Sequence, residues 1–407
     1  MTTHVTCFDM AGAGDVSALE TWLKLQPLAQ LRRLAVFAKT EGHHAPNDFS
    51  RDLLKLKLEQ LFARLGITEC AMSMLAIGSE GVGSPKGFVF TDFADPTGSD
   101  AASPSEERSE SEERSESTIE STAIGTEEVT GEDINRAARE DSGGVGNDAK
   151  GAANANKSDK DRLVLGTARS EPVPIKEIGT LALVDRVTET ARAALRDAGL
   201  APEQARLLMV KSPLLAARHP AATAANSTMH RGRAISALGG GVALGEVDRS
   251  RLTEEAITQD LSIYSRHVQA ITGAEITQVE VIALGNRPGA AGKLRIATTH
   301  TRDILDQRSI RALLASEGFQ FDAYGELLDG DRIEALIAKT MVAEDNLVRG
   351  SRTIVYASSW APESHIRAAA SGVLGSLLGH LRFFVSADSV HQAPPGGGVT
   401  CVVFRDA

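Results

Sequence analysis

The stretch GHLRFFVSADSVHQAPPGGG, residues 379–398, decides how the chain is interpreted. Its apolar run 381–385 is short, contains aromatic residues and is bounded by turn-forming residues, a pattern typical of a buried strand. The strand delivers Ser386 at its end, and a Pro/Gly turn follows that bends the backbone tightly. A serine at a strand end is a candidate nucleophile when a base lies beside it. Because no Gly-x-Ser-x-Gly motif surrounds Ser386, a histidine-triad hydrolase is not indicated, and we look for a lysine base.

Length, charge and cysteine content limit the class of the protein. Its 407 residues leave room for two or three domains with real cores, and a net charge of −11 argues against non-specific nucleic-acid binding. The three cysteines are widely spaced and form no CxxC pair, which predicts free thiols in a reducing compartment. The sequence shows neither the pattern of a signal peptide nor an apolar run near the ~20 residues that span a bilayer. We therefore expect a cytoplasmic protein with no membrane or nucleic-acid partner.

The chain divides into three similar thirds and one segment of a different kind. Residues 1–96, 160–290 and 291–407 each alternate short apolar strands with amphipathic helices, which predicts three α/β repeat units. Among their less regular stretches we expect helices near 261–268 and 331–337 and a strand at 353–357. Residues 97–159 are rich in Ser, Glu, Gly, Asn and Asp and could bury too little to offset chain entropy, so we predict a disordered acidic insertion. A regulatory or partner-binding role for this insertion stays open.

Each third carries cationic residues in the same order. A lysine follows an apolar segment, an arginine comes later, and a short strand then ends in small residues. The lysines are Lys39, Lys211 and Lys339, the arginines are Arg51, Arg233 and Arg367, and the strand-end positions are Ala76, Ile271 and Ser386. The lysine-to-arginine spacings differ, and any one of these charges taken alone would ordinarily be a solvated surface residue. Their parallel order favours a shared site.

Such a set of residues suits attack on a carbonyl carbon. A lysine desolvated among other cations has a lowered pKa and can accept the proton of a serine hydroxyl. Arginines stay charged, and their planar fork suits the carbonyl oxygens of a flat ligand. Three sets around a pseudo-threefold axis would suit a small planar ring with several carbonyl groups, with backbone amides at the strand ends as the oxyanion site.

Several motifs, taken together, are similar to those of a known family. They are KTEG at 39–42, NDFSR at 47–51, SEGVGSP at 79–85, VKSPLL at 210–215, SALG at 236–239, and the VS, HQAP and GGG segments within 385–398. With these motifs the sequence resembles the ring-opening amidohydrolases, which include cyanuric acid hydrolase and barbiturase. The resemblance covers nearly the whole chain outside the insertion. It implies an α/β fold of three structurally similar α+β repeats around a pseudo-threefold axis, one active site at their junction, a homotetramer, and hydrolysis of a small planar cyclic amide by a serine–lysine pair without a catalytic metal.

The resemblance also implies roles for residues of this chain. The catalytic candidates are Lys211, Lys339, Ser386 and, as an alternative hydroxyl, Thr272. The candidates for substrate binding are Lys39, Arg51, Ala76, Ile77, Arg233, Ile271, Arg367, Ser386 and Ala387. No cofactor is implied for the reaction, but the family has a structural divalent cation held largely by backbone. In this chain that cation would lie at the C-terminal turn, near Ser389, Gln392, Ala393, Pro394 and Gly397.

The sequence departs from the family pattern at the axis and at the cation site. In the family each repeat brings a serine to the axis, whereas here Ala76 and Ile271 replace two of them and Ser386 remains. The second-repeat serine is the family's usual nucleophile, so isoleucine removes it. Thr272 is one position further along the strand and would face the opposite side unless a bulge turns it. Met341 replaces the glutamate that the family uses as a side-chain ligand of the cation.

Three hypotheses about function therefore stay open. The first is an active cyclic-amide hydrolase in which Ser386, activated by Lys339 or Lys211, replaces the usual nucleophile. The second is a non-enzymatic relative that binds a planar ring or serves as a subunit of a larger assembly. The third is a retained fold whose pocket is filled by packing residues at the two altered positions. The presence of all three lysines and all three arginines favours the first hypothesis.

Overall fold

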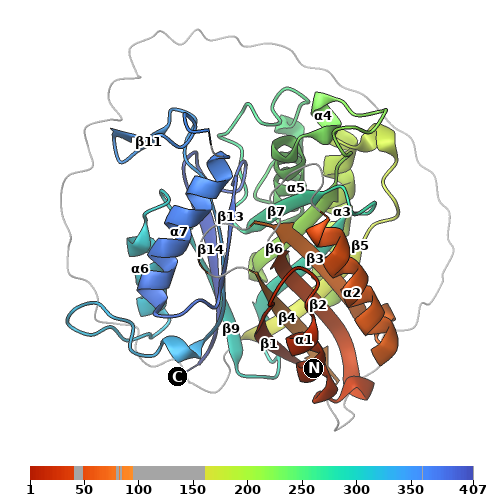
Figure 1. Cartoon of the computed structure of the whole chain (residues 1–407), viewed down its shortest axis with the longest axis vertical. Coiled ribbons are helices and arrows are strands. Elements are labelled where there is room, and N and C mark those ends of the chain that lie inside the picture. Colours follow the sequence, from red (N-terminus) through yellow and green to blue (C-terminus); the bar gives the residue numbers. More distant parts are fainter. Residues whose placement is uncertain (41–48, 79–81, 83–84, 95–160, 360, 407) are drawn as a thin grey trace, which may run out of the picture. The chain divides into compact units, whose positions relative to one another are not determined.

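Three four-stranded sheets with the same strand order make up the fold. The computed structural model of the chain describes residues 1–40, 49–78, 82, 85–94, 161–359 and 361–406. Within these residues the strand orders are β1-β4-β2-β3, β5-β8-β6-β7 and β9-β14-β10-β13 (Figure 1). In each sheet the second and third strands of the chain are parallel, and the fourth lies antiparallel between the first and the second. The prediction of three similar α/β repeats is therefore confirmed.

The elements follow one another in the same order in each repeat. The first contains β1 (Thr2–Asp9), α1 (Ser17–Lys24), β2 (Leu31–Thr40), α2 (Ser50–Leu65), β3 (Ala71–Ile77) and β4 (Lys86–Phe93). The second contains β5 (Arg162–Arg169), α3 (Leu181–Ala198), β6 (Ala205–Pro213), α4 (Ala224–Ser227), α5 (Met229–Ala243), β7 (Val268–Gly273) and β8 (Glu280–Arg287). The third contains β9 (Leu294–Thr301), α6 (Gln307–Ser316), β10 (Ile333–Thr340), the short pair β11 (Leu347–Val348) and β12 (Ser351–Arg352), α7 (Pro362–Leu378), β13 (Phe383–Ala387) and β14 (Gly398–Arg405).

Two predicted helices and one predicted strand are wrong. Residues 331–337 form the end of a 3-10 turn and most of β10, residues 261–267 are turn and irregular structure leading into β7, and residues 353–357 are turn. Strand β10 is buried along almost its whole length, so its sequence is a continuous apolar run whose periodicity does not separate a strand from a helix. The predicted disordered insertion at 97–159 lies outside the described residues.

The inner faces of the three sheets meet in one apolar cluster. Equivalent positions on β2, β6 and β10 place Phe37, Met209 and Ile337 in this cluster. The rings of Phe37 and Phe384, whose centroids are 4.3 Å apart, join the first and third sheets. Because side chains alternate along a strand, the residue two positions beyond each of the three strand residues faces the same side. Those residues are the three lysines, which therefore cap the central core.

Helices cover the outer face of each sheet. Helices α1 and α2 cover the first sheet, α3 and α5 the second, and α6 and α7 the third (Figure 1), each with its own apolar cluster. Helix α3 begins after Thr180, whose hydroxyl accepts a hydrogen bond from Ala182 N, and ends at Gly199, whose φ of +63° suits glycine. Helices α2, α5 and α7 lead into β3, β7 and β13, the strands that pair in parallel with the lysine-bearing strands. Each helix carries its arginine within its first two turns. This arrangement brings one arginine per repeat to the lysine end of the sheets.

The described residues belong to one compact unit. Their three cysteines, Cys7, Cys70 and Cys401, are free thiols. Within the described ranges, no helix combines the length and the apolar character that crossing a membrane requires.

Candidate active site

The three lysines occupy the same register position in their sheets. Across the parallel strand pairs, Lys39 lies opposite Ala76, Lys211 opposite Ile271, and Lys339 opposite Ser386. All three lysines are buried, with exposed fractions of 5%, 1% and 1% respectively. The equivalence inferred from their order in the sequence therefore holds residue by residue in the sheets.

Each lysine amine also reaches across to another repeat. The hydrogen bonds run from Lys39 Nζ to the carbonyl of Val385 (2.7 Å), from Lys211 Nζ to that of Leu75 (2.7 Å), and from Lys339 Nζ to that of Ala270. Each accepting carbonyl belongs to the residue just before a strand-end position. The three repeats are thus joined in a closed cycle of contacts, and the predicted convergence of the lysines is present in the structure.

Each lysine also lies in the field of an arginine from the preceding repeat. The pairs are Lys39 with Arg367, Lys211 with Arg51, and Lys339 with Arg233. We name the resulting sets by their strand-end residue: the alanine corner is Lys211, Arg51 and Ala76; the isoleucine corner is Lys339, Arg233 and Ile271; the serine corner is Lys39, Arg367 and Ser386. Of the three strand-end residues, Ser386 alone carries a hydroxyl.

The serine corner holds a lysine whose ammonium form is disfavoured. Burial lowers the pKa of Lys39 well below its ordinary value, and the charge of Arg367 lowers it further. Burial lowers the pKa of Arg367 itself only to about 10, so the guanidinium stays charged at neutral pH. A Cβ at Gly78 would lie 2.4 Å from Lys39 Cε and 3.2 Å from Arg367 Nε, so glycine is required for the close approach of both side chains. Lys339, in register with Ser386, also has a pKa well below its ordinary value through burial and the charge of Arg233.

The alanine corner contains a carboxylate that sequence reasoning missed. Glu275 forms an ion pair with Lys211, and its Oε2 lies 3.2 Å from Arg51 Nη1. Burial raises the pKa of Glu275, but Lys211 and Arg51 outweigh that effect and hold it below its ordinary value. Burial lowers the pKa of Lys211, and the two carboxylates Glu275 and Glu280 oppose this. A sequence signal existed, because Glu275 follows its strand-end position by four residues, as Glu80 does in the first repeat.

The isoleucine corner contains a second missed carboxylate. Asp388 Oδ2 accepts a hydrogen bond from Arg233 Nη1 at 2.9 Å, and Asp388 Oδ1 accepts one from His230 Nδ1 at 3.0 Å. Burial opposes ionisation of Asp388, but His230 and Arg233 hold its pKa below the ordinary range. Asp388 has a φ of +66°, a left-handed conformation that non-glycine residues rarely adopt. Two features of the sequence could have indicated this pair: Asp388 follows Ser386 by two residues, and His230 precedes Arg233 by one helical turn.

Thr272 does not supply the missing hydroxyl. The pairing of β6 and β7 runs through Ile271 and Thr272 without a bulge, so Thr272 faces the side opposite to the lysines. Its Oγ1 donates to the carbonyl of Ser212 at 2.8 Å, and it lies against Gly232 of α5. The prediction of Thr272 as a catalytic residue is therefore wrong.

Two predicted substrate-binding residues have side chains that also face away from the lysines. Ile77 and Ala387 lie one position beyond Ala76 and Ser386 in their strands, and alternation turns them to the other face. Ala387 packs in a small apolar cluster with Ile366. These two residues could contact a ligand at the axis only through their backbone.

The predicted cation site at the C-terminal turn does not fit a hard divalent cation. Ser389 Oγ donates to the carbonyl of Gly397 at 2.6 Å, and Gly397 N donates to the carbonyl of Pro394 at 2.9 Å. Gln392 N donates to the carbonyl of Ser389 at 2.8 Å, so the chain's own donors already occupy these carbonyls. Met341 offers a soft thioether where an oxygen ligand would be needed. In the described part of the chain, no group of three His, Cys, Asp or Glu side chains could hold a metal ion.

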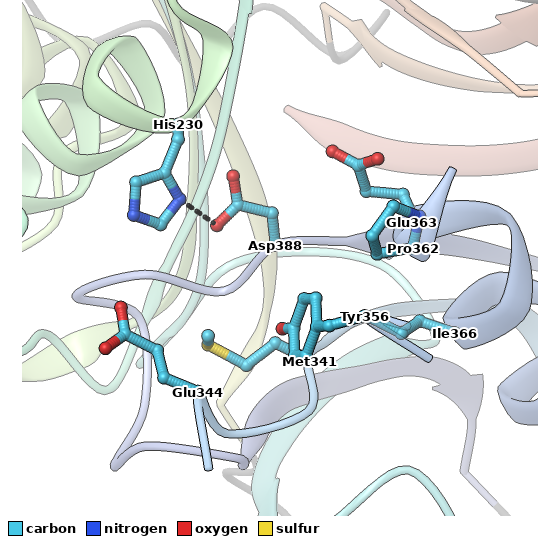
Figure 2. A pocket seen from close by; sticks show the side chains of 8 residues that line it. All are labelled: His230, Met341, Glu344, Tyr356, Pro362, Glu363, Ile366 and Asp388. Atoms are coloured by element: carbon cyan, nitrogen blue, oxygen red, sulfur yellow. Dashed lines mark hydrogen bonds and ion pairs between the residues drawn. The ribbon is translucent and has the colours of Figure 1, made fainter. Parts of the chain in front are cut away.

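A cavity of about 370 Å³ opens beside the isoleucine corner (Figure 2). Its lining consists of His230, Met341, Glu344, Tyr356, Pro362, Glu363, Ile366 and Asp388. Glu363 lies 3.6 Å from Arg233 Nη1, so the cavity and the corner share both the Asp388 and the Glu363 carboxylates. The lining residues come from separate segments of the second and third repeats, and their convergence leaves no local pattern in the sequence.

Comparison with known proteins agrees with this geometry. The sequence model of one family, described as amidohydrolase ring-opening protein, matches residues 4–139 and 147–405. The chain belongs to this family. A cyanuric acid amidohydrolase from a Methylobacterium species is 31% identical, with 97% of this chain and 95% of that protein aligned. A barbiturase from a Nocardioides species is 30% identical over 60% of this chain and 69% of that protein.

A solved structure supports the same assignment. The crystal structure of a cyanuric acid hydrolase from A. caulinodans matches with a TM-score of 0.75 and 26% identity, and the match covers 100% of this chain and 99% of that one. The predicted resemblance to the ring-opening amidohydrolases is confirmed. In this amidohydrolase each of the three corners has a lysine and an arginine, and one of the three strand-end positions has a serine.

Proposed function

We propose that this chain hydrolyses an amide bond of a small planar cyclic amide and so opens its ring, with Ser386 as the nucleophile. The observation that carries the proposal is the position of Ser386, which is buried, lies opposite Lys339 in the sheet and directly follows Val385, whose carbonyl accepts a hydrogen bond from Lys39. Membership of the ring-opening amidohydrolases and relatives that are cyanuric acid amidohydrolases and a barbiturase support this class of substrate.

The serine corner supplies the groups for nucleophilic attack. Burial and the charge of Arg367 lower the pKa of Lys39 and so favour its neutral amine, which donates one N–H to the carbonyl of Val385 and keeps a lone pair for the hydroxyl proton of Ser386. The Ser386 oxygen then bonds to a ring carbonyl carbon, and the charged Arg367 stabilises the oxyanion that forms. When the intermediate collapses, the ring C–N bond breaks and the Lys39 ammonium returns its proton to the leaving nitrogen. Water hydrolyses the resulting ester, with the same amine as base, and regenerates Ser386.

The other two corners are suited to holding the ring rather than attacking it. Ala76 and Ile271 offer no nucleophile, whereas Arg51 and Arg233 still present their charges at the junction. Glu275 and Asp388 neutralise part of that charge. A ring bound between the three corners would therefore be attacked at the serine corner, where Ser386 supplies the nucleophile and Arg367 a charge for the oxyanion.

Activity measurements on purified protein test the proposal. Cyanuric acid, barbituric acid and related cyclic imides are incubated with the protein, and ring-opened product is measured by mass spectrometry. We expect turnover of at least one ring, and a loss of kcat of at least about a thousandfold in Ser386→Ala. Thr272→Val is the matched control. It also removes a hydroxyl near a strand end, but the side chain of Thr272 faces away from the lysines. Lys39→Met and Lys339→Met identify the base, which we expect to be Lys39.

The possible results separate the three hypotheses. Full activity in Ser386→Ala would remove this serine from the mechanism. Tight binding of a ring in calorimetry without turnover would favour a ring-binding protein without enzymatic activity. Absence of both binding and turnover would leave a retained fold with a filled pocket. We also propose that the protein is a homotetramer, which the family resemblance supports, and that it is cytoplasmic, which the three free thiols support.

A further inference from the structure

The cavity adjoins the isoleucine corner through Asp388 and Glu363, which both contact Arg233. Several lining residues follow or precede a corner residue closely in the sequence: Met341 follows Lys339 by two positions, Asp388 follows Ser386 by two, His230 precedes Arg233 by three, and Ile366 precedes Arg367 by one. The strands and helices that place the corners therefore also build the cavity. A ligand bound at the corners would have this cavity as the adjoining space.

The walls of the cavity combine apolar surface with carboxylates. Met341, Ile366 and the ring of Tyr356 form the apolar part, and the Tyr356 hydroxyl is directed away to the carbonyl of Val342, to which it donates at 2.6 Å. Figure 2 shows the Glu344 and Glu363 carboxylates on opposite sides, with Met341 and Tyr356 between them. This combination suits a group with a short apolar stem and a polar end.

The charge of the lining is negative. Its ionisable groups are the carboxylates of Glu344, Glu363 and Asp388 together with His230 and Tyr356. Asp388 already accepts hydrogen bonds from His230 Nδ1 at 3.0 Å and from Arg233 Nη1 at 2.9 Å. Glu363 shares Arg233 with Asp388 at the longer distance of 3.6 Å, and Glu344 is exposed, so both carboxylates keep charge to offer a cationic ligand group.

The departure from the family pattern falls in the same place. Met341 stands where the resemblance implies a glutamate ligand for a cation, and it contributes apolar surface to the cavity instead. A cavity of about 370 Å³ is at the lower end of the range for small-molecule sites and exceeds what a water-filled notch would need. The chain thus replaces a cation ligand by space for part of an organic molecule.

We propose that this cavity is a subsite for a substituent on the substrate ring, and that the preferred substituent ends in an amine. The inference rests on the proposed function and names the substrate class more closely: a planar cyclic amide with a short alkylammonium side chain. The alkyl stem packs on Met341 and Ile366, and the ammonium lies between Glu344 and Glu363. The ring itself stays at the three corners.

A matched pair of substrates tests the subsite. The same cyclic imide ring is prepared with an N-butyl or an N-(3-aminopropyl) group, which differ only by a terminal methyl against an ammonium. We expect wild-type kcat/KM for the aminopropyl ring to exceed that for the butyl ring about threefold to fivefold, the size of a partly exposed charge contact. Glu344→Gln and Glu363→Gln should each reduce this preference, and the double variant should abolish it. Glu171→Gln, at an exposed position outside the cavity, should keep the full preference.

The outcomes distinguish the subsite from the proposed function. If the butyl ring is opened as well as the aminopropyl ring, the amine subsite is wrong while the hydrolase stands. If no ring is opened, the dissociation constants of the two rings are compared by calorimetry; an amine preference that Glu344→Gln reduces would support the subsite and refute the hydrolase. If neither ring binds or reacts, both inferences are wrong. A preference that survives both glutamate substitutions would also refute the subsite.

Discussion

Replacing Lys39 by methionine tests whether the serine corner holds a neutral amine. Lys39 is 5% exposed, and its amine lies beside Arg367 and donates to one backbone carbonyl. Its pKa in the folded protein is therefore well below its value in the unfolded chain, which is about 10.4. Between these two values the unfolded chain binds one proton more than the folded chain does. Stability therefore rises with pH there, by up to about 1.4 kcal/mol per pH unit from this group.

Urea unfolding at several pH values between 7 and 10 measures this effect. Methionine is similar in length and does not titrate, so Lys39→Met should be more stable than wild type at pH 7. That advantage should shrink as the pH rises, by up to about 1.4 kcal/mol per unit, and become constant above about pH 10.4. Lys24→Met is the control, because the Lys24 side chain is 59% exposed and its substitution should add no such slope. An advantage that stays constant or grows with pH would show that Lys39 is held as an ammonium, and would refute its role as the base.

Two further substitutions test the packing around the junction. Glu275→Gln leaves Lys211 and its neighbouring arginine buried without their carboxylate, so we expect a loss of about 3–5 kcal/mol in the free energy of unfolding. The double variant Glu275→Gln, Lys211→Met should recover part of that loss, and strictly additive effects in this double-mutant cycle would contradict the pairing. Gly398→Ala should destabilise by about 2 kcal/mol or more, because the new Cβ would lie 1.9 Å from the carbonyl oxygen of Lys339. Gly372→Ala, in a helix with open space around it, should be neutral or slightly stabilising, and equal melting temperatures for the two alanine variants would disprove the clash.

The sequence allowed the repeats and the cationic residues to be predicted, because both leave local signals. Strand β13 is an example, because its apolar run, predicted at 381–385, is bounded by turn-forming residues and is found at Phe383–Ala387. Strand β10 was predicted as a helix, because burial on both faces removes the alternation that identifies a strand. The order of Lys39, Lys211 and Lys339 in their thirds was enough to predict their equivalence.

The roles of the carboxylates and the cavity were not predicted, because they depend on contacts between distant parts of the chain. Glu275 meets Lys211 across 64 positions and Asp388 meets Arg233 across 155. Lys39 meets the strand of Ser386 across 346 positions, so this lysine was expected to bind substrate, and Lys339 or Lys211 was expected to be the base. Periodicity and local motifs carry no information on such contacts, which arise only when the three inner faces assemble.

The cycle of lysine contacts means that every corner belongs to two successive repeats. An isolated repeat has a lysine and an arginine but cannot build even one complete corner. A symmetric trimer of single repeats would have three identical corners, and any substitution would change all of them at once. Fusion into one polypeptide breaks that constraint, so each corner can specialise separately. Alanine, isoleucine and serine at three equivalent positions are consistent with such independent divergence, which leaves a hydroxyl at one corner and none at the strand ends of the other two.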